Sequence, residues 1–431
     1  MRIVFTTWGS LGDLHPYLAL GVEMKRRGHD ASIATLGQWR QAVREAGLGF
    51  HPLRPAVPAD DAAARQMVRD LLDARRGPQH LFEEVFGPVM RESYEDTLAA
   101  VRADGGADLI VTHQIPVAGP IVAETTGVRW VSCVLLPMAF LSKYDPATPP
   151  QAPALQKVAA LHPLCAAAFI RLGRLVTRRW AEPTYRLRQE LGLPRGRSPL
   201  FEGQHSPALV LALFSRVLAR KQPDFPSQTV VTGFAFYDAA DTRPADPQLL
   251  HFLDAGEPPV VFTLGSSAVW IAEDFYQTAI AAVRMLGRRA LLLAGDQAAA
   301  LRAGGLPDTI AAFEYAPHSA VMPRGSAIVH QGGVGTTGQA LRSGRPQLVV
   351  PFGQDQPDNA RRCVALGVAR SLARSAFRPE RVAAELRVLL EDDGYPRRAA
   401  DVAATVRAEN GTVTACDAIE RSLANPTRQL C

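Results

Sequence analysis

Two glycine-containing turns carry the residue types best suited to chemistry, and each follows a short run of β-branched and aromatic residues. The first turn spans 9–16 (GSLGDLHP) and leads into a helical pattern. Asp13 in this turn is either an ordinary helix cap or a general base that takes a proton from a reacting hydroxyl. Pro16 suits the first turn of a helix, so the pattern alone leaves both roles of Asp13 open.

The second turn lies in 327–338 (AIVHQGGVGTTG), where a strand pattern ends at His330 and Thr336 and Thr337 open a helix. Glycines let the backbone come close to a ligand, and a helix N-terminus offers unpaired N–H groups and the positive end of the helix dipole. The side chains of His330 and the two threonines add donors. This chemistry predicts a diphosphate site, and a tight turn without a ligand is the alternative.

A polar cluster follows the next expected strand and spans 352–359 (FGQDQPDN). Asp355 accepts hydrogen bonds from hydroxyl groups, and Gln356 both donates and accepts them. The cluster therefore suits a hydroxyl-rich ligand such as a sugar, or it forms only the polar cap of the helix that follows.

These turns do not carry the better-known cofactor motifs. Neither has the G-x-G-x-x-G spacing of dinucleotide sites or the Gly-Lys-Ser/Thr ending of a Walker loop, which counts against nicotinamide, flavin and P-loop chemistry. The adjacent pairs Asp60-Asp61 and Asp392-Asp393 resemble solvated surface charge rather than a metal site. We expect no metal ion and no other cofactor.

The composition indicates an ordinary globular protein. The 431 residues are 47% apolar and 21% charged, which suits two domains. The formal charge of +5 is spread along the chain, so nucleic acid is not an expected partner. The five scattered cysteines indicate reduced thiols, and no apolar run reaches the ~20 residues of a membrane span. The sequence therefore predicts a cytoplasmic protein.

Eight arginines between residues 171 and 197 form the one local excess of positive charge. They either meet an anionic lipid at the inner membrane, which would make the protein peripheral to it, or form a solvated helix face. The solvated face is the plainer explanation of the two.

The elements that must position these turns repeat along the chain. Residues 2–8 predict a strand, a helical pattern follows up to Gly28, and 31–35 predict a second strand. The same order returns from residue 261. Two such β-α-β openings predict two doubly wound domains with parallel sheets. The second opening covers 261–266, 275–286 and 290–294, further strands are expected at 109–112, 130–134, 210–213, 327–330 and 347–350, and a late helix at 415–423.

Four prolines among polar residues give the stretch 223–247 the composition of a linker. We therefore expect an N-terminal domain over 1–222, a C-terminal domain over 248–405 and a final segment over 406–431. Ligands of open parallel sheets bind beyond the carboxyl ends of the strands, so the default site is a cleft between the two domains.

Three segments together, 315–318 (YAPH), 330–337 (HQGGVGTT) and 351–356 (PFGQDQ), resemble the donor signature of the UDP-glycosyltransferase superfamily. Its members are inverting enzymes with the two-domain GT-B fold. The opening 9–16 is similar to the matching element of its bacterial members. Within the superfamily, the sequence most resembles the rhamnolipid rhamnosyltransferases, through 27–29, 39–43, 232–234, 262–266 and 274–276.

The resemblance implies an α/β fold of the GT-B type, with two doubly wound, Rossmann-like domains facing a central cleft. Residues 1–222 would bind the acceptor, 248–405 would bind the nucleotide-sugar donor, and the last helix, within 406–431, would cross back to the N-terminal domain. Asp13 falls where the family keeps its catalytic base. The donor site would comprise Gly12, Gly265, Ser266, Tyr315, His318, His330, Gly332, Gly333, Val334, Gly335, Thr336, Thr337, Asp355 and Gln356.

An acceptor pocket is expected in the N-terminal domain, where 67–90 and 137–169 are rich in apolar side chains. These side chains favour a hydrophobic acceptor, unless they only form core. Either His15 or His113 would orient Asp13. The candidate pocket residues are His15, His113, Met138 and Phe140.

Two departures from the family pattern leave open which nucleotide base the donor carries. Gly338 stands where plant-type members have a glutamate that grips the ribose hydroxyls, so a deoxyribose donor (dTDP) is allowed as well as UDP. Tyr315 replaces a tryptophan that would stack on the base.

The resemblance and the residues together predict a metal-independent, inverting hexosyltransferase. It would move a sugar from a dTDP-rhamnose-like or UDP-sugar donor to a hydroxyl of a hydrophobic, lipid-like acceptor of the hydroxyalkanoate type, with Asp13 as the base. The alternatives are a UDP-glucose-dependent transferase acting on a sterol or natural-product aglycone, a non-catalytic GT-B-like helper of another transferase, and a nucleotide-sugar epimerase. The oligomeric state is left open.

Overall fold

The computed structural model describes residues 1–115, 117–238 and 246–424. The chain divides into two compact units, which we describe one at a time. The N-terminal unit comprises Met1–Ala64, Arg75–Tyr237 and the chain from Glu409 onward. The C-terminal unit comprises Arg65–Ala74 and Asp238–Ala408.

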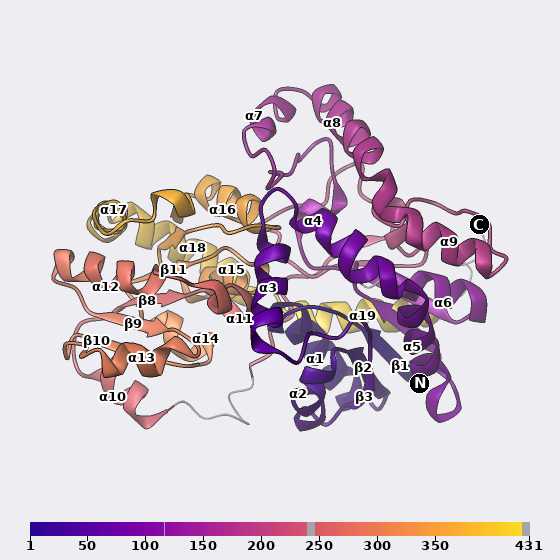
Figure 1. Ribbon diagram of the computed structural model, residues 1–431, viewed down its shortest axis with the longest axis horizontal. Coiled ribbons are helices and arrows are strands. Elements are labelled where there is room, and N and C mark those ends of the chain that lie inside the picture. The colour runs from indigo at the N-terminus through magenta and orange to yellow at the C-terminus, as the bar shows by residue number, and fades with distance from the viewer. Residues whose placement is uncertain (116, 239–245, 425–431) are drawn as a thin grey trace. The chain divides into compact units, whose positions relative to one another are not determined.

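The N-terminal unit is built on a seven-stranded parallel sheet in the order β3-β2-β1-β4-β5-β6-β7 (Figure 1). Its central strands are buried on both faces, as expected where helices cover a parallel sheet. The strands are β1 (Arg2–Thr6), β2 (Asp30–Thr35), β3 (Gly49–Pro52), β4 (Leu109–Thr112), β5 (Arg129–Val134), β6 (Val210–Ala212) and β7 (Thr229–Val231). The helices are α1 (Leu11–Arg26), α2 (Arg40–Glu45), α4 (Gly77–His80), α5 (Met90–Arg102), α6 (Ala118–Thr126), α7 (Leu155–Ala159), α8 (Pro163–Val176), α9 (Glu182–Glu190) and α19 (Gly411–Ala424).

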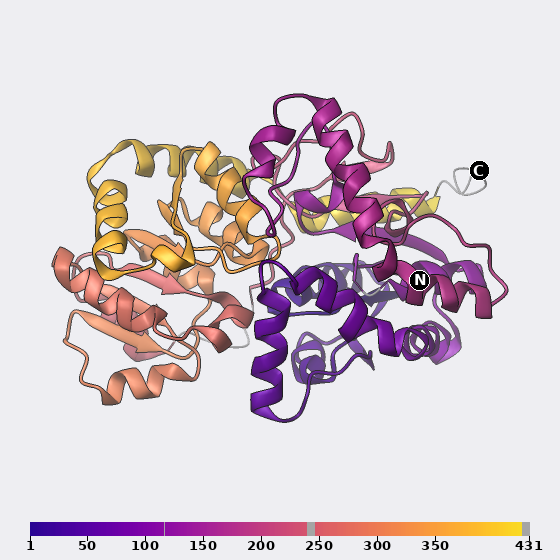
Figure 2. The same ribbon diagram turned by 45° about the horizontal axis from the view of Figure 1, so that its top comes forward.

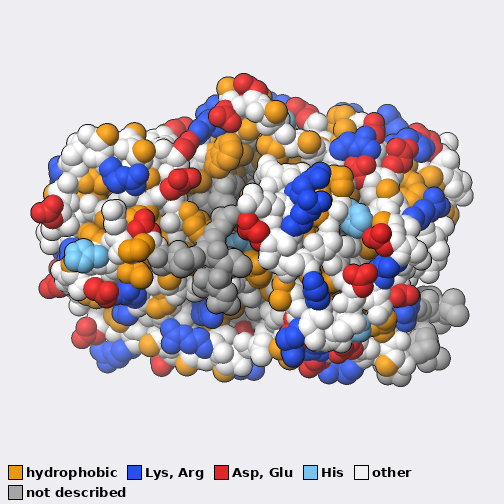
Figure 3. Space-filling model, turned by 90° about the horizontal axis from the view of Figure 1, so that it is seen from below, with side chains coloured by type: hydrophobic (Ala, Val, Ile, Leu, Met, Phe, Trp, Pro, Cys, Tyr) orange, Lys and Arg blue, Asp and Glu red, His pale blue; other side chains and the backbone are white. Residues whose placement is uncertain are grey.

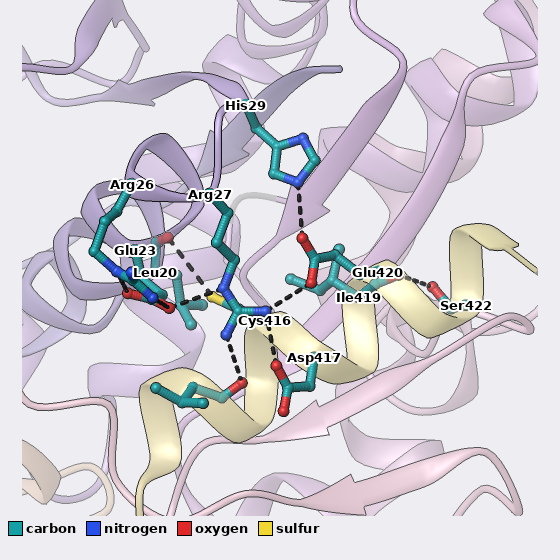
Figure 4. A network of polar contacts seen from close by, with 11 residues as sticks. Leu20, Glu23, Arg26, Arg27, His29, Cys416, Asp417, Ile419, Glu420 and Ser422 are labelled. Atoms are coloured by element: carbon teal, nitrogen blue, oxygen red, sulfur yellow. Dashed lines mark hydrogen bonds and ion pairs between the residues drawn. The ribbon is translucent and has the colours of Figure 1, made fainter.

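The last helix, α19, packs against α1 although nearly the whole chain separates them (Figures 1 and 2). Arg27 joins the two elements, with Nη1 2.7 Å from Asp417 Oδ1 and 2.6 Å from Glu420 Oε2 (Figure 4). His29 Nε2 lies 3.0 Å from Glu420 Oε1. These two basic side chains, His29 first, hold the pKa of the Glu420 carboxyl below its usual value. Buried Ile419 adds an apolar contact surface beneath the ion pairs.

The C-terminal unit has a six-stranded parallel sheet in the order β10-β9-β8-β11-β12-β13. Alternate residues of β8 face opposite ways. Phe262 packs with α12 and α17 on one face, and Val261 packs with α10 and α14 on the other (Figure 1). The strands are β8 (Val260–Thr263), β9 (Ala290–Leu293), β10 (Ile310–Phe313), β11 (Ala327–His330), β12 (Gln347–Val349) and β13 (Ala369–Ser371). The helices are α10 (Pro247–Asp254), α11 (Gly265–Ala268), α12 (Phe275–Leu286), α13 (Gln297–Ala303), α14 (His318–Val321), α15 (Val334–Ser343), α16 (Gln356–Ala365), α17 (Pro379–Glu391) and α18 (Gly394–Ala408).

The structure has the predicted fold class, since each unit is a parallel sheet with helices on both faces. The unit boundaries differ from the expected ones in two places. Residues 65–74, in α3 (Asp61–Leu72) and just after it, belong with the C-terminal unit rather than the first domain, because Val68 and Leu72 pack on its apolar core. Residues 223–237 are part of the N-terminal unit and include β7, so the expected linker is shorter, and its part 239–245 lies outside the described residues.

Over the described part of the chain, no helix has the length and apolar character needed to cross a membrane. On the face of the molecule drawn in Figure 3, the side chains of Lys and Arg are interspersed with those of Asp and Glu. The net positive charge is therefore not gathered on this face.

Candidate functional site

Each sheet has one point where the strand order reverses, and the candidate residues follow the strands at those points. In the N-terminal unit the order turns between β1 and β4, and in the C-terminal unit between β8 and β11. Ligands of doubly wound sheets bind beyond the carboxyl ends of the strands at such points. Asp13 and His113 follow the first pair of strands, and Gly265 and His330 belong to the second.

Asp13 caps the helix in which it lies. Its Oδ2 accepts hydrogen bonds from the Ser10 N–H at 2.8 Å and from the Ser10 hydroxyl at 3.2 Å. The Ser10 side chain in turn bonds the first turn of α1, which completes a capping box. The second carboxylate oxygen, Oδ1, lies 3.9 Å from His113 Nε2. The structure therefore assigns one oxygen to the cap and directs the other toward a histidine.

His113 is buried, and its Nδ1 lies 2.5 Å from the Ile115 carbonyl oxygen. A carbonyl only accepts, so Nδ1 carries a proton, and the other ring nitrogen, Nε2, faces Asp13. Burial lowers the pKa of His113, and burial raises the pKa of the Asp13 carboxyl although its side chain remains 30% exposed. A carboxylate with a raised pKa and one accessible side is suited to take a proton.

The two other candidate residues beside Asp13 in the sequence, Gly12 and His15, have different neighbours in the structure. The ring of His15 packs near that of Tyr237, with centroids 5.6 Å apart, whereas His113 faces Asp13. Gly12 lies in the first turn of α1 beside the Ser10 hydroxyl. Of the two histidines proposed to orient Asp13, the structure brings His113 to it.

A cavity of about 1090 Å³ opens beside His113 within the N-terminal unit. Phe140 forms part of its wall and stacks on Phe225 with ring centroids 3.9 Å apart. Met138 and His15 are not among the residues that line it. Arg171, Arg174, Arg188 and Arg197 do line it, so half of the arginines between 171 and 197 face this cavity.

His330 closes strand β11 and differs from its expected role as a donor to phosphate. Its ring is fully buried, Nδ1 accepts from the Gly332 N–H at 3.1 Å, and Nε2 lies 3.1 Å from Gln347 Oε1. Both ring nitrogens are therefore engaged inside the protein, and burial lowers the pKa of His330 to about 4. The histidine holds the glycine turn in place and does not itself present a proton to a ligand.

The glycine turn brings backbone close to its surroundings. Gly332 has a φ of +93°, and a Cβ there would lie 2.9 Å from Val349 Cγ1. Gly333 precedes α15 and offers no side-chain cap. Thr336 and Thr337 are buried, whereas Gly333, Val334 and Gly335 before them are partly exposed. Gly335 lies in the same first turn of α15.

The polar cluster after β12 braces this turn. Asp355 Oδ2 accepts from the Val334 N–H at 3.2 Å, which is the first N–H of α15, and from Asn359 Nδ2 at 2.6 Å. Gln356 is only 3% exposed, and its Oε1 accepts from the N–H groups of Phe352 and Gly353 at 2.7 and 3.3 Å. In this structure both proposed sugar ligands have partners within the protein.

The turn after β8 touches the glycine turn. Gly265 has a φ of +65°, and a Cβ there would lie 2.5 Å from Gln331 Nε2 and 3.1 Å from Thr336 Oγ1. Ser266 follows it in α11. His318 Nε2 lies 3.4 Å from Thr263 Oγ1, and Tyr315 is 48% exposed after β10. Gly12 lies in the N-terminal unit, and the other segments that the sequence assigned to the donor site lie at one edge of the C-terminal sheet.

Several positioning residues had no clear sequence signal. Gln347 contacts His330 from the neighbouring strand, and Gln331 contacts Thr336 from within the glycine turn. In the sequence each resembles an ordinary buried polar residue. Asn359 could have been found, because its spacing of four residues from Asp355 on a helix places the two side chains together. Among the described residues, no group of three or more His, Cys, Asp or Glu side chains is arranged to hold a metal ion.

Comparison with known proteins shows the family to which the chain belongs. Residues 3–86 match the family model of the glycosyltransferase family 28 N-terminal domain, and residues 289–417 match that of the erythromycin biosynthesis protein CIII-like C-terminal domain. The chain is 33% identical over 430 residues to O-mycaminosyltylonolide 6-deoxyallosyltransferase of Streptomyces fradiae, with 97% of each chain covered. It is 30% identical over 426 residues to vancomycin aglycone glucosyltransferase of Amycolatopsis orientalis, with 98% of each covered.

A solved structure has the same fold. The glycosyltransferase VinC in complex with dTDP aligns with a TM-score of 0.68 at 20% identity, over 99% of this chain and 100% of that one. These comparisons do not show the narrower likeness to rhamnolipid rhamnosyltransferases. They do show the broader one, and the chain belongs to the UDP-glycosyltransferase superfamily of GT-B enzymes as a nucleotide-sugar-dependent hexosyltransferase.

Proposed function

We propose that the enzyme transfers a hexosyl group, with inversion, from a nucleoside diphosphate to a hydroxyl of a hydrophobic acceptor bound in the N-terminal unit, with Asp13 as the general base. The observation that carries this proposal is the Asp13–His113 pair beside a cavity of about 1090 Å³. His113 lines this cavity, and the partly exposed Asp13 carboxylate that faces His113 can receive the proton of a hydroxyl bound there.

The proposed reaction needs one carboxylate. Asp13 takes the proton as the acceptor oxygen forms its bond to the anomeric carbon, and the bond from that carbon to the diphosphate oxygen breaks on the opposite face. The nucleoside diphosphate leaves with the electron pair. No covalent enzyme intermediate arises, which separates this chemistry from that of retaining glycosidases with their two carboxylates.

We place the donor diphosphate at the N-terminus of α15. The N–H groups of Val334 and Gly335 and the dipole of this ten-residue helix would stabilise the charge that develops on the leaving group. In the structure Asp355 Oδ2 accepts from the Val334 N–H. Donor binding would replace that bond and turn Asp355, with Gln356 after it, toward the sugar hydroxyls.

We propose that these N–H groups meet the charge requirement without a metal ion. The direct check is turnover by enzyme treated with a strong chelator and dialysed. Undiminished turnover is expected, and loss of turnover that Mg²⁺ or Mn²⁺ restores would contradict this part of the proposal.

The proposed donor is a dTDP-linked deoxyhexose. Gly338 stands where plant-type members have the glutamate that grips the ribose hydroxyls. The S. fradiae relative, O-mycaminosyltylonolide 6-deoxyallosyltransferase, is named for a deoxysugar. The structure of VinC was solved with dTDP. A UDP-linked glucose-type donor is the second candidate, because vancomycin aglycone glucosyltransferase is named for glucose.

The proposed acceptor is a natural-product aglycone. Two relatives, named for O-mycaminosyltylonolide and for vancomycin aglycone, favour this class. Phe140, which lines the cavity, offers an aromatic surface that suits a ring system. A lipid-like hydroxyalkanoate is the narrower alternative from the sequence.

The experiment that tests the donor site is a thermal-shift titration with dTDP and with UDP, which needs no acceptor. A ligand that binds only the folded protein stabilises it by roughly 2.7 kcal/mol at a hundredfold excess over Kd. Gly332→Ala should lose the shift, because a Cβ there collides with Val349. Gly173→Ala is the matched control, since a Cβ at this helical position meets nothing within 4 Å.

Each outcome of this titration has a meaning. A larger shift with dTDP than with UDP supports the deoxysugar donor, and the reverse order turns the search to UDP-glucose. No shift with either nucleotide would contradict the donor site and favour a non-catalytic helper of another transferase.

A further inference from the structure

The cavity beside His113 contains more positive than negative side chains, which bears on its occupant. Its lining includes five Lys and Arg side chains but only three carboxylates. The cationic side chains are Lys143, Arg171, Arg174, Arg188 and Arg197, and the carboxylates are those of Glu124, Glu202 and Asp224.

All three carboxylates already have partners. Arg188 binds Glu124 through two bonds of 2.7 and 3.0 Å, and Arg174 pairs with Glu202. Asp224 accepts from the Ser142 hydroxyl at 2.7 Å and from the Lys143 backbone N–H at 2.8 Å. Two of the three carboxylates are therefore paired with arginines, and the third, Asp224, is hydrogen-bonded by neutral donors.

The other three cationic side chains are not matched in this way. Among the residues that the structure describes, no carboxylate lies within ion-pair distance of Lys143, Arg171 or Arg197. Lys143 is partly buried, and its Nζ lies over the ring of Tyr144, 5.1 Å from the centroid. A cavity with an excess of one sign concentrates a ligand of the opposite sign, because its low-dielectric walls focus the field.

Part of the lining of the same cavity is apolar and aromatic. Trp130, Phe140 and Ile121 contribute apolar surface. His113 and His205 also line the cavity, and the buried atoms His113 Nε2 and His205 Nδ1 have no hydrogen-bond partner in the described chain.

We infer that the acceptor carries a carboxylate or a similar anionic group on an apolar scaffold, with the anion bound by Lys143, Arg171 and Arg197 and the reacting hydroxyl near His113, which lines the same cavity and faces Asp13. This inference deepens the proposed function and rests on it, because it treats the cavity as the acceptor site. The carboxylate could belong to a ring system or to a hydroxy fatty acid, and the chemistry that the three cations recognise is the same.

The test is equilibrium binding of matched acid and ester probes, without donor and without turnover. The ring probes are 6-hydroxy-2-naphthoic acid and its methyl ester, and the chain probes are 3-hydroxydecanoic acid and its methyl ester. Binding is followed by the fluorescence of Trp130, which lines the cavity, and Trp130→Phe identifies its share of the signal. We expect one acid to bind roughly tenfold more tightly than its ester, a preference that salt weakens.

Two variants should remove this preference while folding normally: Lys143→Gln and the double variant Arg171→Gln/Arg197→Gln. The matched control is Arg178→Gln/Arg179→Gln, which removes the same charge from exposed residues that do not line the cavity. Thermal midpoints check that each variant is folded. The scaffold on which the acid preference appears distinguishes the two sources of the carboxylate.

Equal affinities for acid and ester would overturn the inference, as would a preference that all variants keep, or a lack of binding by all four probes. The dTDP and UDP titration is independent of these measurements. A failed acid preference together with a normal nucleotide shift would therefore leave the proposed transfer reaction in place.

Discussion

The two units have the same kind of strand-order reversal, but different chemistry at it. After β1, the helix α1 is capped from within by Ser10 and Asp13, and a carboxylate faces a histidine. After β11, the helix α15 has no side-chain cap of its own, and its first N–H is held by Asp355 from another loop. An internal cap cannot be exchanged without undoing the helix start, whereas a cap from a neighbouring loop can give way to a ligand. The topology thus provides the same place in both units, and the turn residues differ: a carboxylate capping its own helix in one, and a helix start capped from another loop in the other.

The largest expected effect comes from removing the base and leaving the cap. Asp13→Asn keeps an oxygen that can accept from Ser10, but it cannot take a proton, so we expect the rate of transfer to fall by about a thousandfold. Nucleotide binding should be unchanged. Turnover is measured at saturating donor and acceptor, and Ser10→Ala is the control for the cap alone. An Asp13→Asn enzyme with normal turnover would show that the two turns do not differ as described.

The second effect concerns acid stability in the C-terminal unit. Burial lowers the pKa of His330 from its ordinary value of 6.5 to about 4, so unfolding takes up a proton at pH values between these two. The free energy of unfolding is therefore unaffected by this titration above about pH 6.5. As the pH falls from there toward 4, the free energy of unfolding decreases by up to about 3 kcal/mol. His330→Gln should flatten this part of the profile. Urea midpoints across the range measure it, and parallel profiles for the two proteins would contradict the buried, neutral histidine.

A smaller effect should follow from crowding the two turns of the C-terminal unit. Gly265→Ala places a Cβ 2.5 Å from Gln331 Nε2 at a left-handed φ, which we expect to cost about 2 kcal/mol in nucleotide affinity. Binding of acceptor probes in the N-terminal unit should not change. Calorimetry with dTDP gives the first quantity and Trp130 fluorescence the second. An equal loss of affinity for dTDP and for the acceptor probes would show that the substitution acts on both units and not on the C-terminal unit alone.

The smallest effect is expected where α19 docks. Arg27→Gln removes the ion pairs to Asp417 and Glu420, two partly exposed carboxylates, and should lower the stability of the N-terminal unit by about 1 kcal/mol. Hydrogen exchange in α1 and α19 should increase, while exchange in α15 should not. Faster exchange in α15 as well would show that the two units do not unfold separately.

The strands that the sequence did not predict share one position. β3, β7, β10 and β13 are the edge strands of the two sheets. An edge strand is paired on one side only and is covered less completely, so its residues are less uniformly buried than those of a central strand, even in β10, whose sequence is apolar throughout. β3 is the extreme case, since none of its residues is buried. The inner strands, with apolar residues on both faces, were all predicted.

The sequence by itself determined the two repeated β-α-β openings, the fold class, the superfamily and the turns in which chemistry is sought, because these depend on local periodicity and on motif spacing. Tertiary structure alone decided which side chains meet and which face a ligand. It brought His113 to Asp13 across 100 residues, buried both ring nitrogens of His330 in contacts of their own, and turned Arg171 and Arg197 toward a cavity. The physical reason is that strand order and burial set these distances, and neither is a property of neighbouring residues in the chain.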